Sequence, residues 1–439
     1  MADKNHDIIE DLKNRKETLW LNPDLIQVEP AFKLEGFGYV HVRAAQNRFM
    51  RYLPFVAKTF PETAEKKGVI ESPLIPIPKM QAWFEKEGLP MKGRLFLKDD
   101  ARLPVAGSVK ARGGIHEVMK LAEVLAQRAG LLMPGESYEK LASPEMKEFF
   151  GQYTIQAGST GNLGISIGRT AARFGFRTII HMSSDAKQWK KDLLRSEGVT
   201  VVEYDGDYSS AVAAGRKASE ADEKSFFVDD ENSEELFFGY STAAVRLAVQ
   251  FSKANILVDK DHPLFVYLPC GVGGAPGGIT FGLKQKFGNN VHCFFAEPLE
   301  QPCMTLAMAS GKQDQISTSD IGLGGRTIAD GLAVGRASGF TCRMMEPLMS
   351  GAYTLSDEQM EVYRKALWQT EGIRLEPSAC AGFLGAAMMG SCNDGVEQNQ
   401  TSAWRAYLED HDLLDKMDNA THIAWGTGGG LVPESQWED

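Results

Sequence analysis

The pattern of apolar and polar positions changes near residue 74. Before it, apolar and charged residues are mixed at helical spacing, so residues 1–60 predict mostly helix with breaks at Pro23, Pro30 and Pro54. After it, short apolar runs alternate with stretches of helical spacing. The runs predict strands at 94–98, 153–157, 177–183, 199–205, 225–230, 263–270, 291–298 and 421–430. Strands that alternate with helices predict an α/β protein with mainly parallel sheets.

The stretches between these strands predict helices at 111–130, 161–175, 186–198, 208–222 and 240–254. The active sites of parallel sheets lie at the carboxyl ends of the strands. Four stretches rich in glycine and small residues follow predicted strands, at 107–114, 158–164, 271–278 and 425–430. We therefore expect these four loops to converge on one crevice.

Length and composition narrow the class of protein. A chain of 439 residues usually forms two domains, and changes of pattern suggest boundaries near 150 and 240. The net charge of -11 argues against a nucleic-acid partner. Six dispersed cysteines lack metal-site spacing and predict free thiols. Because the charged N-terminus lacks a signal-peptide core and no run is long enough to span a membrane, we expect a cytoplasmic protein with no membrane partner.

The loop GSVKARGG (107–114) contains one lysine among small residues. Most lysines are solvated surface residues, which is the simplest interpretation of Lys110. However, Lys110 stands where a strand meets a helix, and its neighbours Gly107, Ser108, Gly113 and Gly114 leave room for a ligand. Desolvation there would favour the neutral amine, which is a nucleophile or a base.

The loop GVGGAPGG (271–278) follows an apolar strand and precedes a predicted helix. Glycines allow backbone N–H groups to surround an anion, and a helix N-terminus adds positive potential. The loop lacks the GK[ST] ending of a P-loop and the GxGxxG spacing of a dinucleotide site. It predicts a phosphate cradle, although a glycine turn that packs a helix tightly on a sheet would have the same composition.

The two remaining loops offer hydrogen-bond donors. In GSTGNLG (158–164), Ser159, Thr160 and Asn162 could bind a carboxylate at a helix start, or they could simply cap the helix. In WGTGGG (425–430), Thr427 could hydrogen-bond a heteroatom of a ligand. A lysine, a phosphate cradle, a carboxylate loop and a polar group for a ring nitrogen together meet the requirements of pyridoxal phosphate (PLP) chemistry.

The four motifs occur as AGSVKARGG, GSTGNLGISIG, GVGGAPGG and GTGGGLVP, and in this order they resemble the fold-type II PLP enzymes of the tryptophan synthase β-like group. The stretches 185–208, 228–233, 294–304 and 330–339 resemble the D-serine dehydratase family in particular. The resemblance covers roughly residues 70–435. It implies two domains, each with a mainly parallel sheet flanked by helices, with the active site in the crevice between them. Residues 1–152 with 240–439 would form the large PLP-binding domain, and 153–239 the small substrate-side domain.

The resemblance also assigns roles to the residues of the motifs. Lys110 would form the Schiff base with the cofactor aldehyde, Asn162 would hydrogen-bond the ring hydroxyl, and Thr427 would face the pyridine nitrogen. The cofactor phosphate would be held by the backbone of Gly271, Val272, Gly273, Gly274 and Ala275. The substrate carboxylate would be bound by Ser159, Thr160 and Gly161.

The implied reaction converts D-serine to pyruvate and ammonia, with slower conversion of D-threonine to 2-oxobutanoate. Departure of the hydroxyl group needs a proton donor, for which Asp229 or Asp230 is a candidate, with Asp230 preferred, unless the two form a solvated acidic pair. Either Lys110 or Thr160 would remove the α-proton. Alternatives are the same chemistry on L-serine, L-threonine or diaminopropionate, a catalytically silent PLP-binding protein, or a phosphate-binding α/β module without PLP.

A cation site is also implied. Glu297 matches the carboxylate of a metal site that related enzymes have beside the glycine loop, but Cys303 stands where a second acidic residue is expected. This difference favours a monovalent ion such as potassium, while a structural salt bridge is the alternative role for Glu297. The extended N-terminal region could cover a surface that dimeric relatives use, so we expect a monomer.

Overall fold

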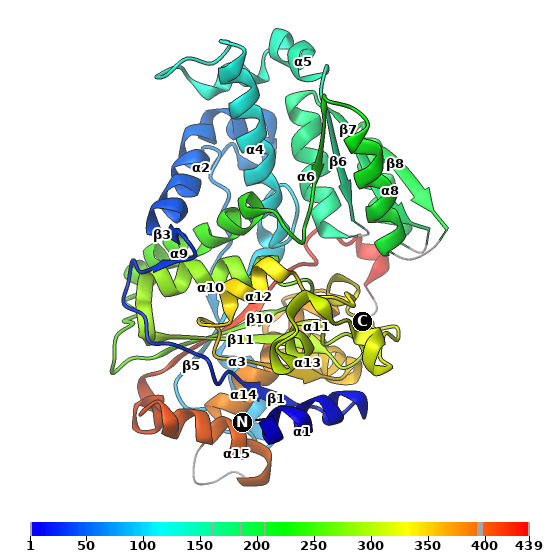
Figure 1. Ribbon diagram of the computed structural model, residues 1–439. Helices are drawn as coiled ribbons and strands as arrows, with labels where there is room; N and C mark the ends of the chain where they lie inside the picture. The colour runs from blue at the N-terminus through cyan, green and yellow to red at the C-terminus, as the bar shows by residue number, and fades with distance from the viewer. Residues whose placement is uncertain (1, 160, 185, 206–207, 393–397, 438–439) are drawn as a thin grey trace.

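The computed structural model describes residues 2–159, 161–184, 186–205, 208–392 and 398–437. Two main sheets organise the chain, one of seven strands in the order β1-β12-β11-β10-β13-β5-β4 and one of four in the order β8-β7-β6-β9. Figure 1 shows them in different halves of the molecule, with the four-stranded sheet at the upper right. The short strands β2 (Lys33–Leu34) and β3 (Phe37–Gly38) pair separately. The predicted α/β architecture with parallel sheets is confirmed.

The seven-stranded sheet has a buried parallel centre. Its parallel strands are β5 (Arg94–Asp99), β13 (Thr421–Gly426), β10 (Leu264–Pro269), β11 (Val291–Pro298) and β12 (Gly351–Leu355). The antiparallel strands β1 (Leu19–Leu21) and β4 (Leu74–Pro76) form the two edges. Every residue of β10, β11, β12 and β13 is buried, which explains why these strands are mostly apolar and do not alternate with exposed polar positions. The sequence pattern did not predict β12.

The four-stranded sheet is parallel throughout and comes from one continuous part of the chain. Its strands are β6 (Thr154–Gly158), β7 (Arg177–Ser183), β8 (Thr200–Tyr204) and β9 (Ser225–Val228). The helices α6 (Asn162–Phe174), α7 (Gln188–Ser196) and α8 (Tyr208–Glu220) connect them. Helix α6 of this sheet packs against helix α4, which belongs to the predicted large domain. The predicted domain boundaries stay a prediction.

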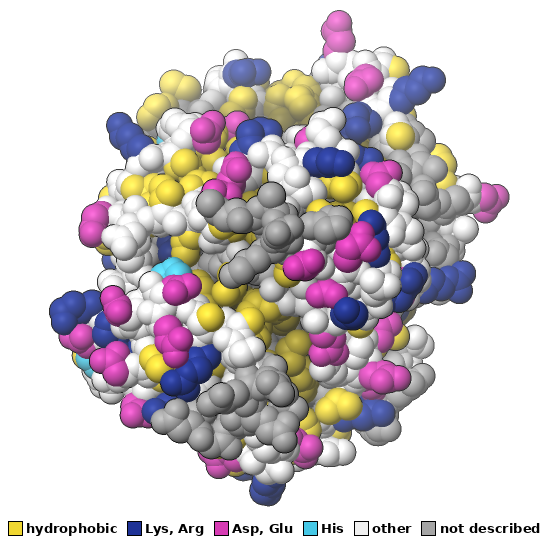
Figure 2. Space-filling model, turned by 60° about the horizontal axis from the view of Figure 1, so that its bottom comes forward, with side chains coloured by type: hydrophobic (Ala, Val, Ile, Leu, Met, Phe, Trp, Pro, Cys, Tyr) yellow, Lys and Arg dark blue, Asp and Glu magenta, His cyan; other side chains and the backbone are white. Residues whose placement is uncertain are grey.

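The other helices surround the two sheets. They are α1 (Ala2–Lys13), α2 (Tyr39–Thr59), α3 (Pro78–Lys86), α4 (Lys110–Arg128), α5 (Pro144–Phe150), α9 (Glu234–Ala254), α10 (Gly274–Phe287), α11 (Cys303–Ser310), α12 (Gly339–Met345), α13 (Asp357–Glu371), α14 (Gly382–Gly390) and α15 (Gln398–Asp410). Within the described ranges, every helix is too short or too polar to cross a lipid bilayer. On the face that Figure 2 shows, lysine and arginine side chains are interspersed with acidic ones.

The break predicted at Pro54 is wrong, because α2 continues through this residue. A proline inside a helix removes one hydrogen bond and costs about 3 kcal/mol. The helix buries one face here, with Tyr52 and Phe55 fully inaccessible to solvent and Val56 nearly so. Burying large side chains contributes about 1.5–3 kcal/mol each, which offsets the cost of the proline.

Helix α2 is joined to α4 by buried polar contacts that include a histidine. Arg48 Nη1 lies 2.6 Å from His116 Nε2, and His116 Nδ1 lies 2.8 Å from the carbonyl oxygen of Glu235. The arginine donates to Nε2, so the histidine must be neutral and donate through Nδ1. Burial, together with the charge of Arg48, lowers the pKa of His116 to about 3.

This histidine gives a prediction for the pH dependence of stability. The unfolded chain binds a proton at His116 below about pH 6.5, whereas the folded protein does so only near pH 3. Because the unfolded state then holds more protons, we expect the contribution of His116 to fall by up to about 1.4 kcal/mol per pH unit as the pH drops through this window. Urea unfolding from pH 7 to 4 should show a shallower decline in His116→Gln than in the wild type. The exposed residue His411 provides the control, since His411→Gln should retain the wild-type slope.

Candidate active site

Lys110 is the first residue of α4, and its amine faces an acidic side chain. Lys110 Nζ lies 3.0 Å from Asp230 Oδ2 and 3.4 Å from Oδ1. The two side chains are only 19% and 12% exposed. Lys110 Nζ also lies 5.8 Å from the centre of the Tyr240 ring, on helix α9. The solvated interpretation of Lys110 is therefore wrong, since its amine is largely enclosed and paired.

The predicted proton donors Asp229 and Asp230 have different partners. Asp229 Oδ2 accepts a hydrogen bond from Arg216 Nη2 at 2.9 Å. Arg216 lies on α8, one of the helices that connect the strands of the four-stranded sheet. Asp230 alone pairs with Lys110. The acidic pair after β9 is thus not simply solvated, and its second member belongs to the site.

The loop after β13 is joined to the start of α4. Val109 N donates to the carbonyl oxygen of Thr427 at 2.7 Å, and Ser108 forms a β-bridge with Gly428. These contacts bring Thr427 beside the residue that precedes Lys110. The hydroxyl of Ser108 is buried, and among the described residues it has no hydrogen-bond partner.

The glycine loop lies beside Asp230, the partner of Lys110. It connects β10 to α10, which begins at Gly274, and the first N–H groups of a helix have no acceptor within it. A Cβ built on Gly274 would lie 3.4 Å from the backbone oxygen of Asp230 and 3.8 Å from its Oδ1. Gly273 has a φ of +108°, which suits glycine. Backbone amides at a helix start, close to the acid that pairs with Lys110, suit the phosphate and the aldehyde of PLP.

Gly273→Ala should therefore disturb this loop. The new Cβ would lie 2.3 Å from Met304 Cε, and the backbone would be strained by about 1–3 kcal/mol. We expect a lower melting temperature and less bound PLP per chain, measured by absorbance. Gly311→Ala is the matched control, because Gly311 has a φ of +67° and open space around its Cβ position. Equal PLP content in the two variants would contradict the assignment of this loop.

The loop before α6 contains Ser159, whose hydroxyl group binds backbone amides at the start of the helix. Ser159 Oγ accepts hydrogen bonds from Gly161 N at 3.2 Å and Gly164 N at 3.0 Å, so this hydroxyl caps the helix start. Its role toward a substrate carboxylate stays a prediction. Thr160, predicted to carry a proton or bind the carboxylate, lies outside the described residues.

Asn162 points away from this cap. Asn162 Nδ2 donates to Glu376 Oε1 at 2.9 Å, and both atoms lie against Gly428, next to Thr427. Burial, with the nearby charge of Asp330, raises the pKa of Glu376. Glu376 had no sequence signal, because it lies in a loop between two predicted elements and belongs to none of the four motifs.

Glu297 is buried beneath the glycine loop. Its Oε1 accepts from Met304 N at 2.7 Å, and its Oε2 accepts from Thr305 N at 2.8 Å and Thr305 Oγ1 at 2.6 Å. Burial raises the pKa of Glu297 to about 7. The thiol of Cys303 lies 3.4 Å from the carbonyl oxygen of Gly271, which links this carboxylate region to the loop. Among the described residues, no three His, Cys, Asp or Glu side chains gather to hold a metal ion.

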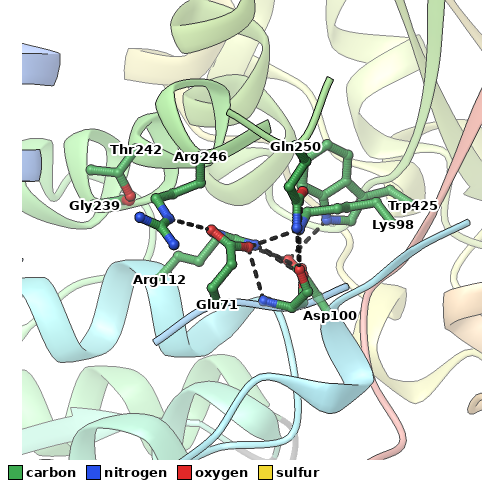
Figure 3. A network of polar contacts seen from close by, with 10 residues as sticks. Glu71, Lys98, Asp100, Arg112, Gly239, Thr242, Arg246, Gln250 and Trp425 are labelled. Carbon is green, nitrogen blue, oxygen red and sulfur yellow. Dashed lines mark hydrogen bonds and ion pairs between the residues drawn. The ribbon is translucent and has the colours of Figure 1, made fainter. Parts of the chain in front are cut away.

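Two residues after Lys110, Arg112 anchors the start of α4 in a buried polar network (Figure 3). Its Nε and Nη2 donate to the two oxygens of Asp100 at 2.9 and 2.8 Å, and Nη2 lies 3.1 Å from Glu71 Oε1. Lys98 Nζ reaches the same Glu71 oxygen at 2.8 Å. Burial opposes ionisation, but Arg112 and Lys98 lower the pKa of Glu71 to about 2.

Comparisons with known proteins agree with this geometry. The family model described as pyridoxal-phosphate dependent enzyme matches residues 66–399. A D-serine dehydratase of Escherichia coli is 53% identical over 431 residues, which cover 98% of this chain and 95% of the relative. A Bacillus cereus protein named "Probable D-serine dehydratase" is 50% identical over 98% of this chain and 94% of its own.

Solved structures share the fold at much lower identity. Diaminopropionate ammonia lyase from Escherichia coli, in a crystal structure in complex with D-serine, superposes with a TM-score of 0.69 at 18% identity and covers 95% of both chains. At this identity the likeness shows the fold alone. The chain therefore belongs to the pyridoxal-phosphate dependent enzyme family, with the fold-type II architecture, and groups there with the D-serine dehydratases.

Proposed function

We propose that this protein converts D-serine to pyruvate and ammonia with the help of PLP. The observation that carries the proposal is the position of the Lys110 amine, 3.0 Å from Asp230 and beside the glycine loop. The D-serine dehydratases that are 50–53% identical to this chain support the choice of substrate. The intact lysine argues against a catalytically silent binding protein, because mere binding does not need a nucleophile.

Four groups of this chain would hold the cofactor. Lys110 would bind its aldehyde carbon, and the backbone from Gly271 to Ala275 would bind its phosphate. Asn162 would hydrogen-bond the ring hydroxyl, and Thr427 would offer a neutral hydroxyl to the ring nitrogen. When bound, PLP withdraws electrons from an amino acid joined to it, which makes the α-hydrogen acidic.

The side chains then move protons. Lys110 or Thr160 would take the α-proton, and Asp230 would give a proton to the β-hydroxyl oxygen so that water leaves rather than hydroxide. Hydrolysis of the dehydrated product consumes one water molecule, so that D-serine yields pyruvate and ammonia with no other reactant. The pairing of Asp230 with Lys110 supports this role, because it holds the acid beside the reacting amine.

The deciding experiment is a pyruvate assay on the purified protein with D-serine and L-serine in parallel, in the presence of potassium. Pyruvate from D-serine alone is the expected result. Pyruvate from L-serine alone would move the assignment to an L-amino-acid dehydratase. The absence of pyruvate from either enantiomer, in a protein that carries PLP, would overturn the choice of serine as substrate.

Finer features of the activity belong to the same proposal. D-Threonine should react more slowly and yield 2-oxobutanoate, because a pocket discriminates only partly against one added methyl group. A potassium ion should bind near Glu297, where Cys303 replaces a second carboxylate. Exchange of potassium for a large organic cation should lower activity in the wild type, and Glu297→Gln should remove this dependence.

We also propose that the protein acts as a monomer in the cytoplasm. The N-terminal strand β1 pairs with β12 and so covers what would otherwise be an exposed sheet edge. The six cysteines are all free and buried, which suits a reducing compartment. Light scattering on the purified protein decides the oligomeric state.

A further inference from the structure

Lys190 is a buried lysine beside the loop assigned to the substrate carboxylate. It lies on α7 and is only 2% exposed. Its Nζ lies 3.9 Å from the position that a Cβ on Gly161 would occupy. Apart from Gly161 and its neighbours in the chain, this amine is the nearest heavy atom to that position among the described residues. A lysine is almost never fully buried unless it has a charged partner or a ligand.

The partner of Lys190 comes from the side of the seven-stranded sheet. Lys190 Nζ lies 3.1 Å from Asp330 Oδ2, in the short helical turn Asp330–Leu332. The next residue, Gly331, packs on the cofactor loop, with its carbonyl oxygen 3.1 Å from a Cβ built on Gly271. Lys190 therefore lies where the carboxylate loop and the cofactor loop approach each other.

Asp330 has a second lysine partner, and the charges of both lysines also act on the buried carboxyl of Glu376. Lys187 Nζ lies 3.4 Å from the same Asp330 oxygen, and the side chain of Lys187 is 50% exposed. Burial works against the ionisation of Asp330, yet the charges of Lys190 and Lys187 lower its pKa. The ammonium group of Lys190 has three N–H donors, and within the described residues one of them is used in a hydrogen bond, to Asp330.

Ser159 Oγ accepts hydrogen bonds from two backbone N–H groups, so its own O–H hydrogen can still be donated to an anion at this loop. We propose that Lys190 binds the carboxylate of the amino-acid substrate and so serves as a substrate-binding residue. The inference rests on the proposed function, because it assumes that an amino acid enters this loop. The charge-assisted hydrogen bond would fix which end of the substrate faces α7.

The test compares an amine that carries the carboxylate with an amine that lacks it. D-Alanine has the carboxylate and no leaving group, and ethanolamine is D-serine without the carboxylate. Binding of each to the PLP-loaded protein is followed through the absorbance of the cofactor. In Lys190→Met, D-alanine should bind about 10- to 100-fold more weakly, while ethanolamine binding changes less than about twofold.

Two variants serve as controls. Lys187→Met removes a charge from the same Asp330 oxygen but from the exposed side, so D-alanine affinity should change less than about threefold. Lys190→Arg keeps the charge and should recover most of the affinity. Because Lys187 still pairs with Asp330 in Lys190→Met, this variant should keep its melting temperature within a few degrees.

Several outcomes would overturn the inference. They are unchanged D-alanine binding in Lys190→Met, equal losses for D-alanine and ethanolamine, and a wild type that does not distinguish the two amines. If the wild type makes no pyruvate from D-serine, the proposed function fails separately, and the comparison of D- and L-alanine with ethanolamine still decides the role of Lys190.

Discussion

Lys110→Ala is expected to lower the rate of pyruvate formation from D-serine by about 10³-fold or more. The amine lies 3.0 Å from Asp230 and at the start of α4, and Asp230 in turn lies beside the cofactor loop. Alanine would remove the covalent link to the cofactor and one of the two candidate bases. Steady-state kinetics with D-serine measures the loss, and the absorbance spectrum of the purified variant should change with it.

Lys120→Ala is the matched control for this variant. Lys120 lies on the same helix, is 36% exposed and pairs with Glu235 at 2.5 Å, so the substitution should leave kcat within about twofold. The role of Lys110 would be refuted if its variant kept more than about a tenth of the wild-type kcat while it was folded and loaded with PLP.

Arg112→Met is expected to reduce the free energy of unfolding by about 3–5 kcal/mol. The guanidinium group is 3% exposed and binds Asp100 through two nitrogens (Figure 3). Methionine fills part of the volume but leaves the Asp100 and Glu71 carboxylates buried beside fewer positive charges. Because Arg112 lies two residues from Lys110, part of the loss should appear as weaker PLP retention during urea unfolding.

Arg128→Met tests whether this loss is specific to the buried network. Arg128 lies at the exposed end of the same helix, so its replacement should change stability by less than about 0.5 kcal/mol. A similar loss in both variants would mean that helix α4 is weakened by the substitution itself. An unchanged stability in Arg112→Met would mean that the network contributes nothing net.

Most of the fold could be predicted because its central strands are buried on both faces. The runs at 263–270 and 291–298 are mostly apolar, and they became β10 and β11 within one residue at each end. The motif loops could be recognised by their glycines after predicted strands, although a structural explanation was open for several of them. Strand β12 was missed because GAYTL is short and begins with two small residues, so burial alone makes it a strand.

The remainder of the site could not be predicted because it depends on tertiary contacts. Lys190 and Asp330 lie on different parts of the fold, and nothing in a helical pattern distinguishes a buried lysine from an exposed one. Ser159 could cap a helix or bind a ligand, and only the two amides that it accepts from show the former. Pro54 shows the same limit, because packing of α2 outweighs the local preference of proline.

The position of β13 has a consequence for how the chain is made. This strand, near the C-terminus, lies between β10 and β5 and pairs with both, Thr421 opposite Arg94 and Leu264. On a ribosome, the large sheet therefore remains open at its centre until β13 emerges, while the four-stranded sheet can already form. Long-range pairing of this kind is slow, and the unpaired edges of β5 and β10 attract other chains meanwhile. The nascent protein should therefore depend on chaperones, and C-terminal truncations that remove β13 should aggregate rather than yield a smaller folded enzyme.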